Sequence, residues 1–403
     1  MLKQRLDRSC PVCKNKTGEI LHQQSFILPN GNPLPPVYDI VSCEKCGFVF
    51  ADTPAEQEDY DNFYRNLSKY EGNSAGSGAG ICQIDKERLS RTADDVSEMA
   101  SKKTVSILDI GCANGGLLVE LRRRGYQNVF GIDPSPICVL KAGERGLNVV
   151  QGGLFSEWKL PQEKFDVITL SHVLEHVRDL RGAFKKIISH LEKDGLLYIE
   201  VPNAREYRNY LIAPFYFFDA EHINHFDHNS LVDLGNTHGL GLVRSIEKLI
   251  RPSSDSLYPA IGCFYRNNKD KKDAPQNRNL QARDSVVKHI NDSKLNQNWQ
   301  GLELLAEQQT EIIVWGAGSN THRLLKNSPL GECKIIGFID KDKRKQGQIL
   351  KEVKIYSSKI LKKLTCPIVI SSALMGKEIY AEIKSMRVKN KIIETNGIKR
   401  KNG

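Results

Sequence analysis

Five short apolar runs, separated by helix-length stretches, dominate the middle of the chain. Between residues 104 and 201 these runs are VSILDI, VFGID, NVVQGG, FDVITLS and GLLYIEV. Continuously apolar runs of this length are typical of strands that are buried on both faces of a parallel sheet. The pattern therefore predicts a doubly wound α/β domain with helices on both faces of the sheet.

Length and composition place further units around this domain. A chain of 403 residues exceeds one ordinary core, and about 150 residues per domain suggests two or three domains. EIIVWGAGSN and KIIGFIDKD near the C-terminus again suggest strands followed by helices. We expect an N-terminal cysteine module with a covering loop (1–80), a central Rossmann-like domain (81–266), a linker and helix (267–308) and a second Rossmann-like domain (309–403).

The charge balance constrains the partner only weakly. A net charge of +10 favours anionic partners, but the lysines are spread along the chain without a dense basic tract. The apolar runs have the length of strands, and the N-terminus lacks the apolar core of a secretory signal. We therefore expect a cytoplasmic protein without membrane contact.

The strongest chemical signal is VSILDIGCANGG. The run predicts a strand that ends near Asp109, turns at Gly111 and opens a helix after Gly115, so that backbone can approach a ligand closely. The next strand ends at Asp133, whose carboxylate could accept hydrogen bonds from ribose hydroxyl groups. A dinucleotide or a purely structural turn remains an alternative, although GCANGG fits the dinucleotide pattern poorly.

This part of the chain resembles the class I S-adenosylmethionine-dependent methyltransferases. The resemblance lies in the DIGCANG turn, the acidic end of the next strand, QGGLF, and FDVITLSHVLEHV after the fourth strand. It implies that S-adenosylmethionine is the cofactor, with Leu154 and Phe155 flanking its adenine. The implied contact residues are Asp109, Gly111, Cys112, Gly115, Asp133, Leu154, Phe155, Ser171 and His172. Because the sulfonium activates its own methyl group, the protein mainly has to position donor and acceptor.

Two CxxC pairs near the N-terminus predict a metal site. They are Cys10 with Cys13 and Cys43 with Cys46, whereas the other cysteines are scattered singly. Four thiolates complete the closed tetrahedral shell of a structural zinc ion, which leaves no position for catalysis. Chance pairing or a redox dithiol are the alternatives.

An aromatic-rich segment after the fifth strand carries a candidate base. It contains Glu221, His222 and His225, and a histidine in an aromatic pocket can act as a general base near neutral pH. His222 is our candidate. The segment could instead pack under the sheet or cap a helix, and a second metal site from these three residues is a further alternative.

The whole layout is similar to the three-part sugar C-methyltransferases of deoxysugar and polysaccharide biosynthesis. That resemblance implies that Glu221 and His222 lie at the acceptor together with a tyrosine from the preceding loop, matched here to Tyr70. Asp219 stands where that family has a second tyrosine. The resemblance implies a nucleotide-linked sugar as substrate, methylated at a carbon next to a ketone or at a hydroxyl oxygen.

The C-terminal unit carries a weaker glycine signal. Gly316 and Gly318 follow a strand, and Asp340 ends the next one, but Thr321 stands where a dinucleotide site has its third glycine. We therefore expect a degenerate Rossmann-like domain, and binding of NAD or of the nucleotide end of a sugar is the alternative.

Two other functions remain open from the sequence. A nucleic-acid methyltransferase would dock its substrate through the cysteine module, but that module lacks a stripe of basic and aromatic residues, so no nucleic-acid partner is expected. A non-catalytic scaffold that binds S-adenosylmethionine is the second alternative, and Asp109, Asp133 and His222 argue against it. The oligomeric state is not predicted.

Overall fold

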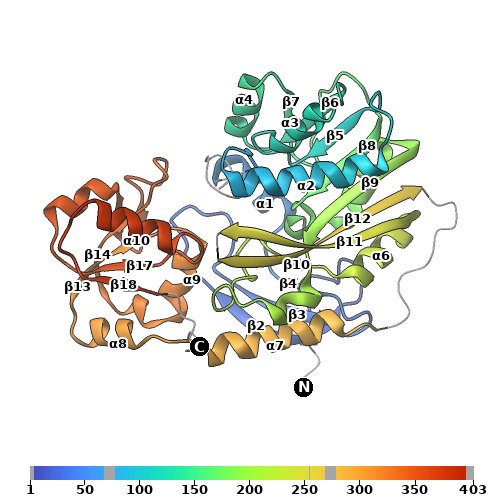
Figure 1. Cartoon of the computed structure of the whole chain (residues 1–403). Coiled ribbons are helices and arrows are strands. Elements are labelled where there is room, and N and C mark those ends of the chain that lie inside the picture. The colour runs from blue at the N-terminus through green and yellow to red at the C-terminus, as the bar shows by residue number, and fades with distance from the viewer. Residues whose placement is uncertain (1–3, 68–77, 254, 268–277, 396–403) are drawn as a thin grey trace. The chain divides into compact units, whose positions relative to one another are not determined.

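The computed structural model describes residues 4–67, 78–253, 255–267 and 278–395. Its contacts divide the chain into two compact units. The first unit contains residues 1–21, 40–210 and 221–286, and the second contains 22–39, 211–220 and 287–403. Figure 1 shows both units and labels many of their helices and strands. The four domain ranges expected from the sequence stay a prediction.

A seven-stranded sheet forms the centre of the first unit. Its strands are β5 (Ile107–Ile110), β6 (Val129–Asp133), β7 (Asn148–Gln151), β8 (Phe165–Ser171), β9 (Leu191–Pro202), β11 (Leu240–Ser253) and β12 (Ser256–Asn267). The spatial order is β11-β12-β9-β8-β5-β6-β7, and the strands from β9 to β7 are parallel. β12 runs antiparallel to β9, and β11 runs antiparallel to β12. The predicted α/β sheet is confirmed, with an antiparallel hairpin added at one edge.

Helices cover both faces of this sheet because consecutive strand residues point to opposite sides. Ile107 packs in one core cluster with α2 (Gln83–Met99) and α3 (Gly116–Arg123), whereas its neighbour Leu108 packs in the other cluster with α5 (Leu180–Ser189) and α6 (His228–Thr237). α4 (Pro136–Glu144) lies between β6 and β7 in the chain and contacts both. A short 3₁₀ helix, η2 (Leu174–His176), follows β8, and η3 (Ala204–Asn209) follows β9.

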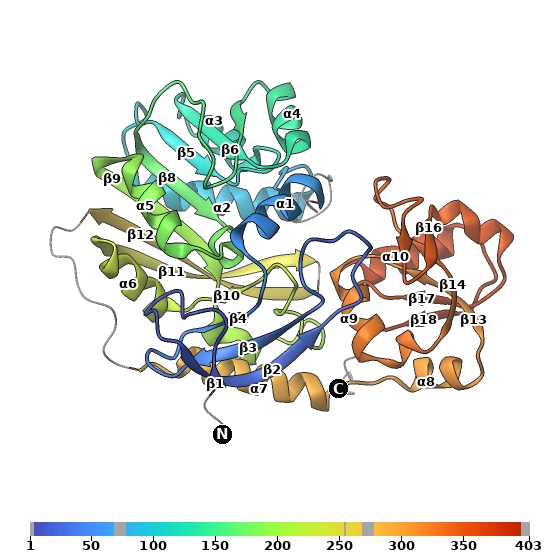
Figure 2. The ribbon, with the colours of Figure 1, turned by 180° about the vertical axis from the view of Figure 1, so that it is seen from behind.

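A smaller five-stranded sheet has the order β1-β2-β3-β4-β10. Its members are β1 (Gln4–Arg5), β2 (Thr17–Ser25), β3 (Val37–Cys43), β4 (Val49–Asp52) and β10 (Asn224–His225). β10 comes from far along the chain and lies beside β4 (Figure 2). The two strands pair antiparallel, with Asn224 opposite Phe50. The N-terminal segment is therefore joined by backbone hydrogen bonds to the segment that carries Glu221 and His222.

The covering loop expected before residue 80 contains a helix. α1 spans Gln57–Leu67, so the prediction of a loop is wrong for these residues. Glu58 and Asp59 in its first turn and Arg65 in its last turn favour a helix through the macrodipole. The fully buried Tyr60 and the partly buried Tyr64, four residues later, lie on one face of that helix.

A six-stranded sheet forms the centre of the second unit. Its order is β15-β16-β14-β13-β17-β18, and all neighbours except β15 and β16 are parallel. The strands are β13 (Glu311–Trp315), β14 (Lys334–Ile339), β15 (Ile349–Leu350), β16 (Val353–Tyr356), β17 (Ile368–Ile370) and β18 (Ile392–Glu394). The helical segments are α8 (Gln300–Glu307), α9 (Ser319–Asn327), η4 (Pro329–Gly331), η5 (Ser358–Lys363) and α10 (Gly376–Ser385).

The helix expected at the end of the polar linker is confirmed as α7 (Gln281–Leu295). Among the described residues, every helix is too short or too polar to cross a lipid bilayer.

Candidate functional site

The turn after β5 has the backbone geometry that its glycines predict. Gly111 and Gly115 have φ angles of +73° and +75°, in the left-handed region where a side chain causes strain. A Cβ atom added to Gly111 would lie 2.7 Å from Cγ2 of Val173, and one added to Gly115 would lie 2.3 Å from Cδ1 of Leu147. Both positions therefore require glycine for their backbone angle and for space.

A second stretch of backbone crosses this turn. The N–H of Gly116, the first residue of α3, donates to the carbonyl oxygen of Gly78 at 2.9 Å. Nη1 of Arg145 donates to the carbonyl oxygens of Ala79 and Asn114, both at 2.8 Å. A dinucleotide is bound through N–H groups at such a helix start, which meet its pyrophosphate. Because the chain itself uses the N–H of Gly116, the turn is poorly suited to a dinucleotide.

The carboxylate of Asp133, at the end of β6, ties the turn to the neighbouring strand. Its Oδ2 accepts a hydrogen bond from the N–H of Ala113 at 2.8 Å, and its Oδ1 accepts one from the N–H of Ser135 at 2.9 Å. Burial raises the pKa of Asp133 to about 6, although these two hydrogen bonds lower it. Each carboxylate oxygen has a further lone pair, so ribose hydroxyl groups can still be accepted there.

A second buried carboxylate lies near the end of β5. Oδ1 of Asp109 accepts a hydrogen bond from Oγ1 of Thr169 at 2.7 Å. Burial raises the pKa of Asp109 to about 7; the bond from Thr169 lowers this pKa and the nearby charge of Asp133 raises it further. An added cation favours the charged form of such a carboxyl group. The turn therefore suits a ligand with cationic groups. S-adenosylmethionine has two such groups, its sulfonium and its ammonium.

Three predicted donor contacts lie in the core around the turn. A Cβ atom on Gly131 would lie 2.6 Å from Sγ of Cys112, so the Cys112 side chain packs against β6. Leu154 is buried, and Phe155 is partly buried with its ring edge against Gly182. Both follow β7, so they flank the carboxyl end of the sheet. Their contact with adenine stays a prediction.

The end of β8 carries a buried ionic network. Oγ of Ser171 donates to Oε1 of Glu200 at 2.9 Å. The ring of His172, which has a φ of +57°, places Nδ1 3.1 Å from Oε1 of Glu175 and Nε2 3.5 Å from Oε1 of Glu200. Burial lowers the pKa of His172, but the two carboxylates raise it by more, so that the resulting pKa is about 9. Nζ of Lys248 pairs with Oε2 of Glu200.

The sequence interpretation missed Glu175, Glu200 and Lys248. Glu200 is a lone charge inside the apolar run LLYIEV, and Lys248 lies in the strand-like run IEKLI. An isolated charge in a buried strand needs a partner, and that signal could have identified them. Because the lysine charge and several hydrogen bonds stabilise its charged form, the pKa of Glu200 is well below its usual range, although burial acts in the opposite direction.

The structure brings the predicted acceptor residues together at η2. Glu221 is 3% exposed, and its carbonyl oxygen lies 2.9 Å from Nδ1 of His176. The rings of His176 and His222 meet edge to face, with 4.8 Å between their centroids. His225 instead lies beside Tyr207, with 3.4 Å between its Nδ1 and the hydroxyl oxygen. Glu221 and His222 therefore belong to one cluster of side chains.

A tyrosine joins this cluster, but it is not the predicted one. The hydroxyl of Tyr64, from α1, donates to Oε2 of Glu221 at 3.4 Å, and its ring meets His176 edge to face. Tyr70 lies outside the described residues. The helical spacing of Tyr60 and Tyr64 was the available signal, since it places both side chains on one face.

The cluster lies next to the glycine turn. Val173 immediately precedes η2, and its Cγ2 atom occupies the space that a side chain on Gly111 would need. The carboxyl ends of β5, β6 and β8, which carry Asp109, Asp133 and Ser171, thus meet at the edge of the sheet where Glu221 and His222 lie. In doubly wound sheets this edge is the usual place for a ligand.

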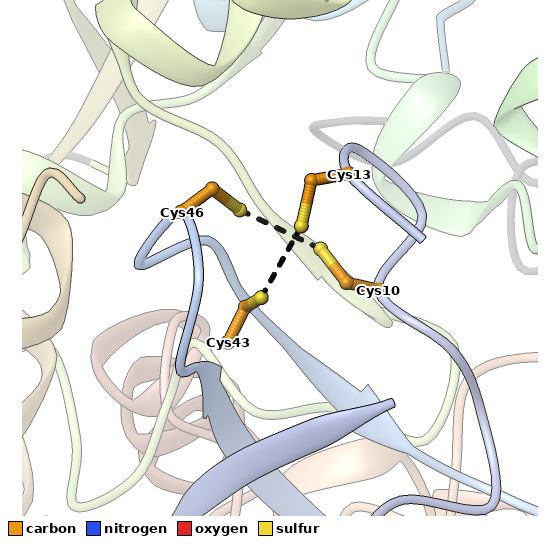
Figure 3. Close-up of side chains that lie close together, drawn as sticks. All are labelled: Cys10, Cys13, Cys43 and Cys46. Carbon is orange, nitrogen blue, oxygen red and sulfur yellow. Dashed lines mark hydrogen bonds between the residues drawn. The ribbon is translucent and has the colours of Figure 1, made fainter. Parts of the chain in front are cut away.

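The four cysteines of the CxxC pairs also meet (Figure 3). Their sulfur atoms all lie within 4.8 Å of one another, and all four side chains are buried. Sγ of Cys10 lies 3.6 Å from Sγ of Cys46, and Sγ of Cys13 lies 3.4 Å from Sγ of Cys43. A tetrahedral zinc ion with bonds of about 2.3 Å separates its sulfur ligands by about 3.8 Å. The arrangement therefore fits four thiolates around one zinc ion after a small outward shift.

Comparison with known families assigns two segments. Residues 84–245 match the model of a methyltransferase domain. Residues 308–394 match a second model, described as C2185-like, N-terminal.

Curated relatives share the first of these segments. The chain is 30% identical over 150 residues to a ubiquinone biosynthesis O-methyltransferase of Histophilus somni, which covers 35% of this chain and 61% of that protein. With the protein of the same name from Glaesserella parasuis it is 30% identical over 173 residues, or 40% of this chain and 71% of the relative. With the C-methyltransferase NovU of Streptomyces niveus it is 24% identical over 213 residues, or 51% of this chain and 47% of the relative.

The match to the methyltransferase model begins with α2 and extends into β11, so it contains the glycine turn, both buried carboxylates and the acceptor cluster except Tyr64. The chain therefore belongs to the class I S-adenosylmethionine-dependent methyltransferases.

Proposed function

We propose that this protein transfers a methyl group from S-adenosylmethionine to a nucleotide-linked sugar. The observation that carries the proposal is that Glu221, His222 and Tyr64 form one cluster with η2, and that Val173, immediately before η2, lies against Gly111 of the glycine turn. Transfer requires the donor carbon and the acceptor atom to be held in line, and a base that removes a proton from the acceptor. In this proposal, the glycine turn and the acceptor cluster would meet these two requirements at one edge of the sheet.

The donor would be held by the residues around the turn. Asp133 would accept hydrogen bonds from the ribose hydroxyl groups, and Asp109 would favour the cationic end of the molecule. When bound, S-adenosylmethionine supplies a methyl group that its sulfonium already activates. The protein's own contribution is therefore binding, orientation and proton removal.

His222 would act as the base. Its ring is partly exposed and lies against His176, whose Nδ1 is 2.9 Å from the carbonyl oxygen of Glu221. A histidine in such a position can take a proton near neutral pH. On a keto-sugar it would remove the acidic proton of the carbon next to the ketone, and that carbon would attack the methyl group. On a hydroxyl acceptor it would remove the oxygen-bound proton, and the product would be a methyl ether.

A sugar substrate is supported by two further observations. The chain resembles the C-methyltransferase NovU over 51% of its length, a longer stretch than the ubiquinone relatives share. The chain also has a four-cysteine cluster before the methyltransferase core and a second, mainly parallel sheet after it, a layout that resembles the three-part sugar methyltransferases. Deoxysugar or surface-polysaccharide biosynthesis would then be the setting.

One assay tests this proposal. Purified protein is incubated with labelled S-adenosylmethionine and a panel of nucleotide sugars with and without a ketone, and the products are analysed by mass spectrometry. A gain of one methylene group on a sugar is expected, and it should be lost in His222→Ala while donor affinity by calorimetry is retained. Methylation of added nucleic acid or quinol precursors, with every sugar left unchanged, would contradict the proposal.

A second assay separates carbon from oxygen as the acceptor. In deuterated water and without S-adenosylmethionine, an enzyme that forms a carbanion next to a ketone exchanges that hydrogen with solvent. Deuterium uptake that depends on His222 indicates carbon methylation. No uptake, together with methyl transfer, indicates a methyl ether as the product.

We also propose that the four cysteines bind zinc and that the second sheet is a degenerate Rossmann-like domain. The sulfur spacing supports the first assignment, and metal analysis of the purified protein should find one zinc ion per chain. For the second sheet, the strand order of its parallel part supports the fold. The hydroxyl of Thr321, at the position of the third glycine, donates to the carbonyl oxygen of Gly316 at 2.9 Å. Calorimetry with NAD should therefore detect no binding that depends on Gly316.

A further inference from the structure

We propose that Arg8 is a positioning residue for the reaction: through its side chain, the four-cysteine module holds the segment that carries Glu221 and His222. The inference rests on the proposed role of His222 as the base. Arg8 is remote from the donor turn in the sequence. Arg8 precedes the first cysteine, Cys10, by two residues.

The guanidinium of Arg8 binds directly beside the acceptor residues. Arg8 is 4% exposed. Its Nη1 donates to the carbonyl oxygens of Ile223 at 3.0 Å and Ala51 at 3.3 Å. Its Nη2 donates to Oδ1 of Asn224 at 2.8 Å and to the carbonyl oxygen of Arg178 at 3.0 Å. Two of its four acceptors therefore belong to the residues that immediately follow His222.

The same short segment is held from the other side by η2. The N–H of Ile223 donates to the carbonyl oxygen of Glu175 at 2.9 Å. Nδ2 of Asn224 donates to the carbonyl oxygens of Leu174 at 2.8 Å and Val177 at 2.7 Å. The segment thus lies between the guanidinium and the helix that contacts His222. Loss of either support would let His222 shift relative to the donor turn.

Arg8 in turn depends on the N-terminal module. Its N–H donates to Oδ1 of Asp52 at 2.6 Å, and its guanidinium lies 5.5 Å from the centre of the Phe50 ring. Both residues belong to β4, which follows the second cysteine pair and pairs with β10. A closed zinc site has no open position for chemistry, so its contribution to the reaction has to be structural. Through Arg8, the N-terminal module contacts Ile223 and Asn224, which immediately follow His222.

Loss of the Arg8 guanidinium is expected to affect the position of His222 more than the stability of the fold. Removing the guanidinium from this buried site takes away the donor of Oδ1 of Asn224 and leaves the carbonyl oxygen of Ile223 with the N–H of Ala51, 2.9 Å away. The lost hydrogen bonds favour a rearrangement that restores them. In-line transfer is sensitive to such movement, because a misplacement of about 1 Å can lower a rate by roughly 100-fold. The donor site does not share these contacts, so its affinity should be unaffected.

The test compares Arg8→Met with Arg178→Met. Arg178 is a matched control because it is also largely buried and donates to the carbonyl oxygen of Thr53 and to the carboxylate of Glu56, rather than to the acceptor segment. For Arg8→Met we expect kcat to fall roughly 10- to 100-fold with S-adenosylhomocysteine affinity and zinc content unchanged. The apparent pKa of the base in the pH–rate profile should shift. Arg178→Met should change neither kcat nor that pKa by more than a small factor, and Arg8→Lys should be intermediate.

A purely structural role gives a different result. A partly unfolded population lowers kcat and the stoichiometry of donor binding together, and it leaves the apparent pKa of the folded fraction unchanged. That outcome, or a wild-type rate in Arg8→Met, overturns the inference. If Arg8→Met does not fold, Arg8→Lys carries the same test, because an ammonium cannot reach all four acceptors.

Failure of the proposed function can be recognised separately. Should the wild-type protein methylate no nucleotide sugar, the ring of His222 can still be followed by NMR after histidine labelling, its signal being assigned by its loss in His222→Ala. Arg8→Met should move the titration midpoint of this signal, and Arg178→Met should not. An unchanged midpoint in Arg8→Met overturns the role of Arg8 whatever the substrate is.

Discussion

The two glycine turns of this chain are built alike, one in each unit. In the first unit, Oδ2 of Asp133 accepts from the N–H of Ala113 and Oδ1 accepts from the N–H two residues after the aspartate. In the second unit, Oδ2 of Asp340 accepts from the N–H of Ala317 at 3.0 Å, and Oδ1 accepts from the N–H of Asp342 at 2.9 Å. Both turns therefore use an acid at the end of the next strand to hold the loop.

The turns differ in what else meets the carboxylate. Asp133 is buried, and burial raises its pKa to about 6. Asp340 forms an ion pair with Nζ of Lys345 at 3.1 Å, and its side chain is partly exposed. The second turn thus supplies a cation from its own chain, whereas the first has a buried acid whose charged form a ligand can stabilise. The same loop geometry is compatible with a donor site in one unit and a structural turn in the other.

Replacing a glycine in each turn should separate fold from function most strongly. Gly115→Ala combines a strained φ with a contact of 2.3 Å to Leu147. We therefore expect the unfolding free energy to fall by about 2–4 kcal/mol and the donor to bind more weakly. Gly316, with a φ of +120°, is the control glycine in the second turn, and Gly316→Ala should lower stability without changing donor affinity in the folded fraction. Denaturant unfolding and calorimetry measure the two effects. Weaker donor binding in Gly316→Ala would contradict the distinction.

Removing the acid of each turn is the next largest effect. Asp133→Ala should weaken S-adenosylhomocysteine binding by about 10- to 100-fold, because charge-assisted hydrogen bonds contribute about 1.5–3 kcal/mol. Asp340→Ala breaks the equivalent backbone contacts in the second turn and should leave that affinity unchanged. Equal affinities in the wild type and Asp133→Ala would show that the ribose contact is misplaced.

The central sheet and the donor turn could be predicted because their signals are local. Buried parallel strands are continuous apolar runs. Gly111 and Gly115 have left-handed backbone angles that favour glycine, so their presence in the sequence indicates the turn. Asp133 follows from its place at a strand end. These features depend on a few consecutive residues, and the structure places them as expected.

The acceptor cluster could be predicted only in part, because its members come from distant segments. His176 lies in the run SHVLEHV that follows the fourth strand. The neighbouring residues in the sequence do not indicate that its ring contacts the ring of His222, 46 positions later. Arg8 contacts Ile223 across 215 positions, and Tyr64 contacts Glu221 across 157. Such contacts follow from sheet pairing between β4 and β10, which the sequence pattern of either strand does not specify.

The raised pKa values of the first turn predict a pH dependence of donor binding. In the protein without bound donor, burial raises the pKa of Asp109 to about 7 and that of Asp133 to about 6, above the ordinary value of 3.8. Their contribution to stability is thus fully present below about pH 4 and is lost as the pH rises through about 7. A cationic donor favours the ionised forms, so S-adenosylmethionine affinity should rise by up to about tenfold from pH 6 to pH 8. The neutral by-product S-adenosylhomocysteine should show a smaller change, since it lacks the sulfonium.

Calorimetry in buffers of different ionisation enthalpy checks this directly. Binding of S-adenosylmethionine near pH 6.5 should release protons, and Asp109→Asn should remove most of that release, because Asp109 has the higher pKa. Donor affinity that is flat between pH 6 and pH 8 would mean that neither carboxylate meets a cationic group of the donor.

The smallest expected effect concerns the ion pair of the second turn. Lys345 is 34% exposed, and solvent screens such a pair, so Lys345→Met should change the unfolding free energy by no more than about 1 kcal/mol. It should not alter donor binding. The variant makes the two turns more alike. The Asp340 carboxylate then keeps the hydrogen bonds from two backbone N–H groups, as the Asp133 carboxylate does. If Lys345→Met then binds a nucleotide that the wild type does not, the intrinsic cation is what keeps the second turn without a ligand; if it binds none, the ion pair is not the feature that separates the two turns.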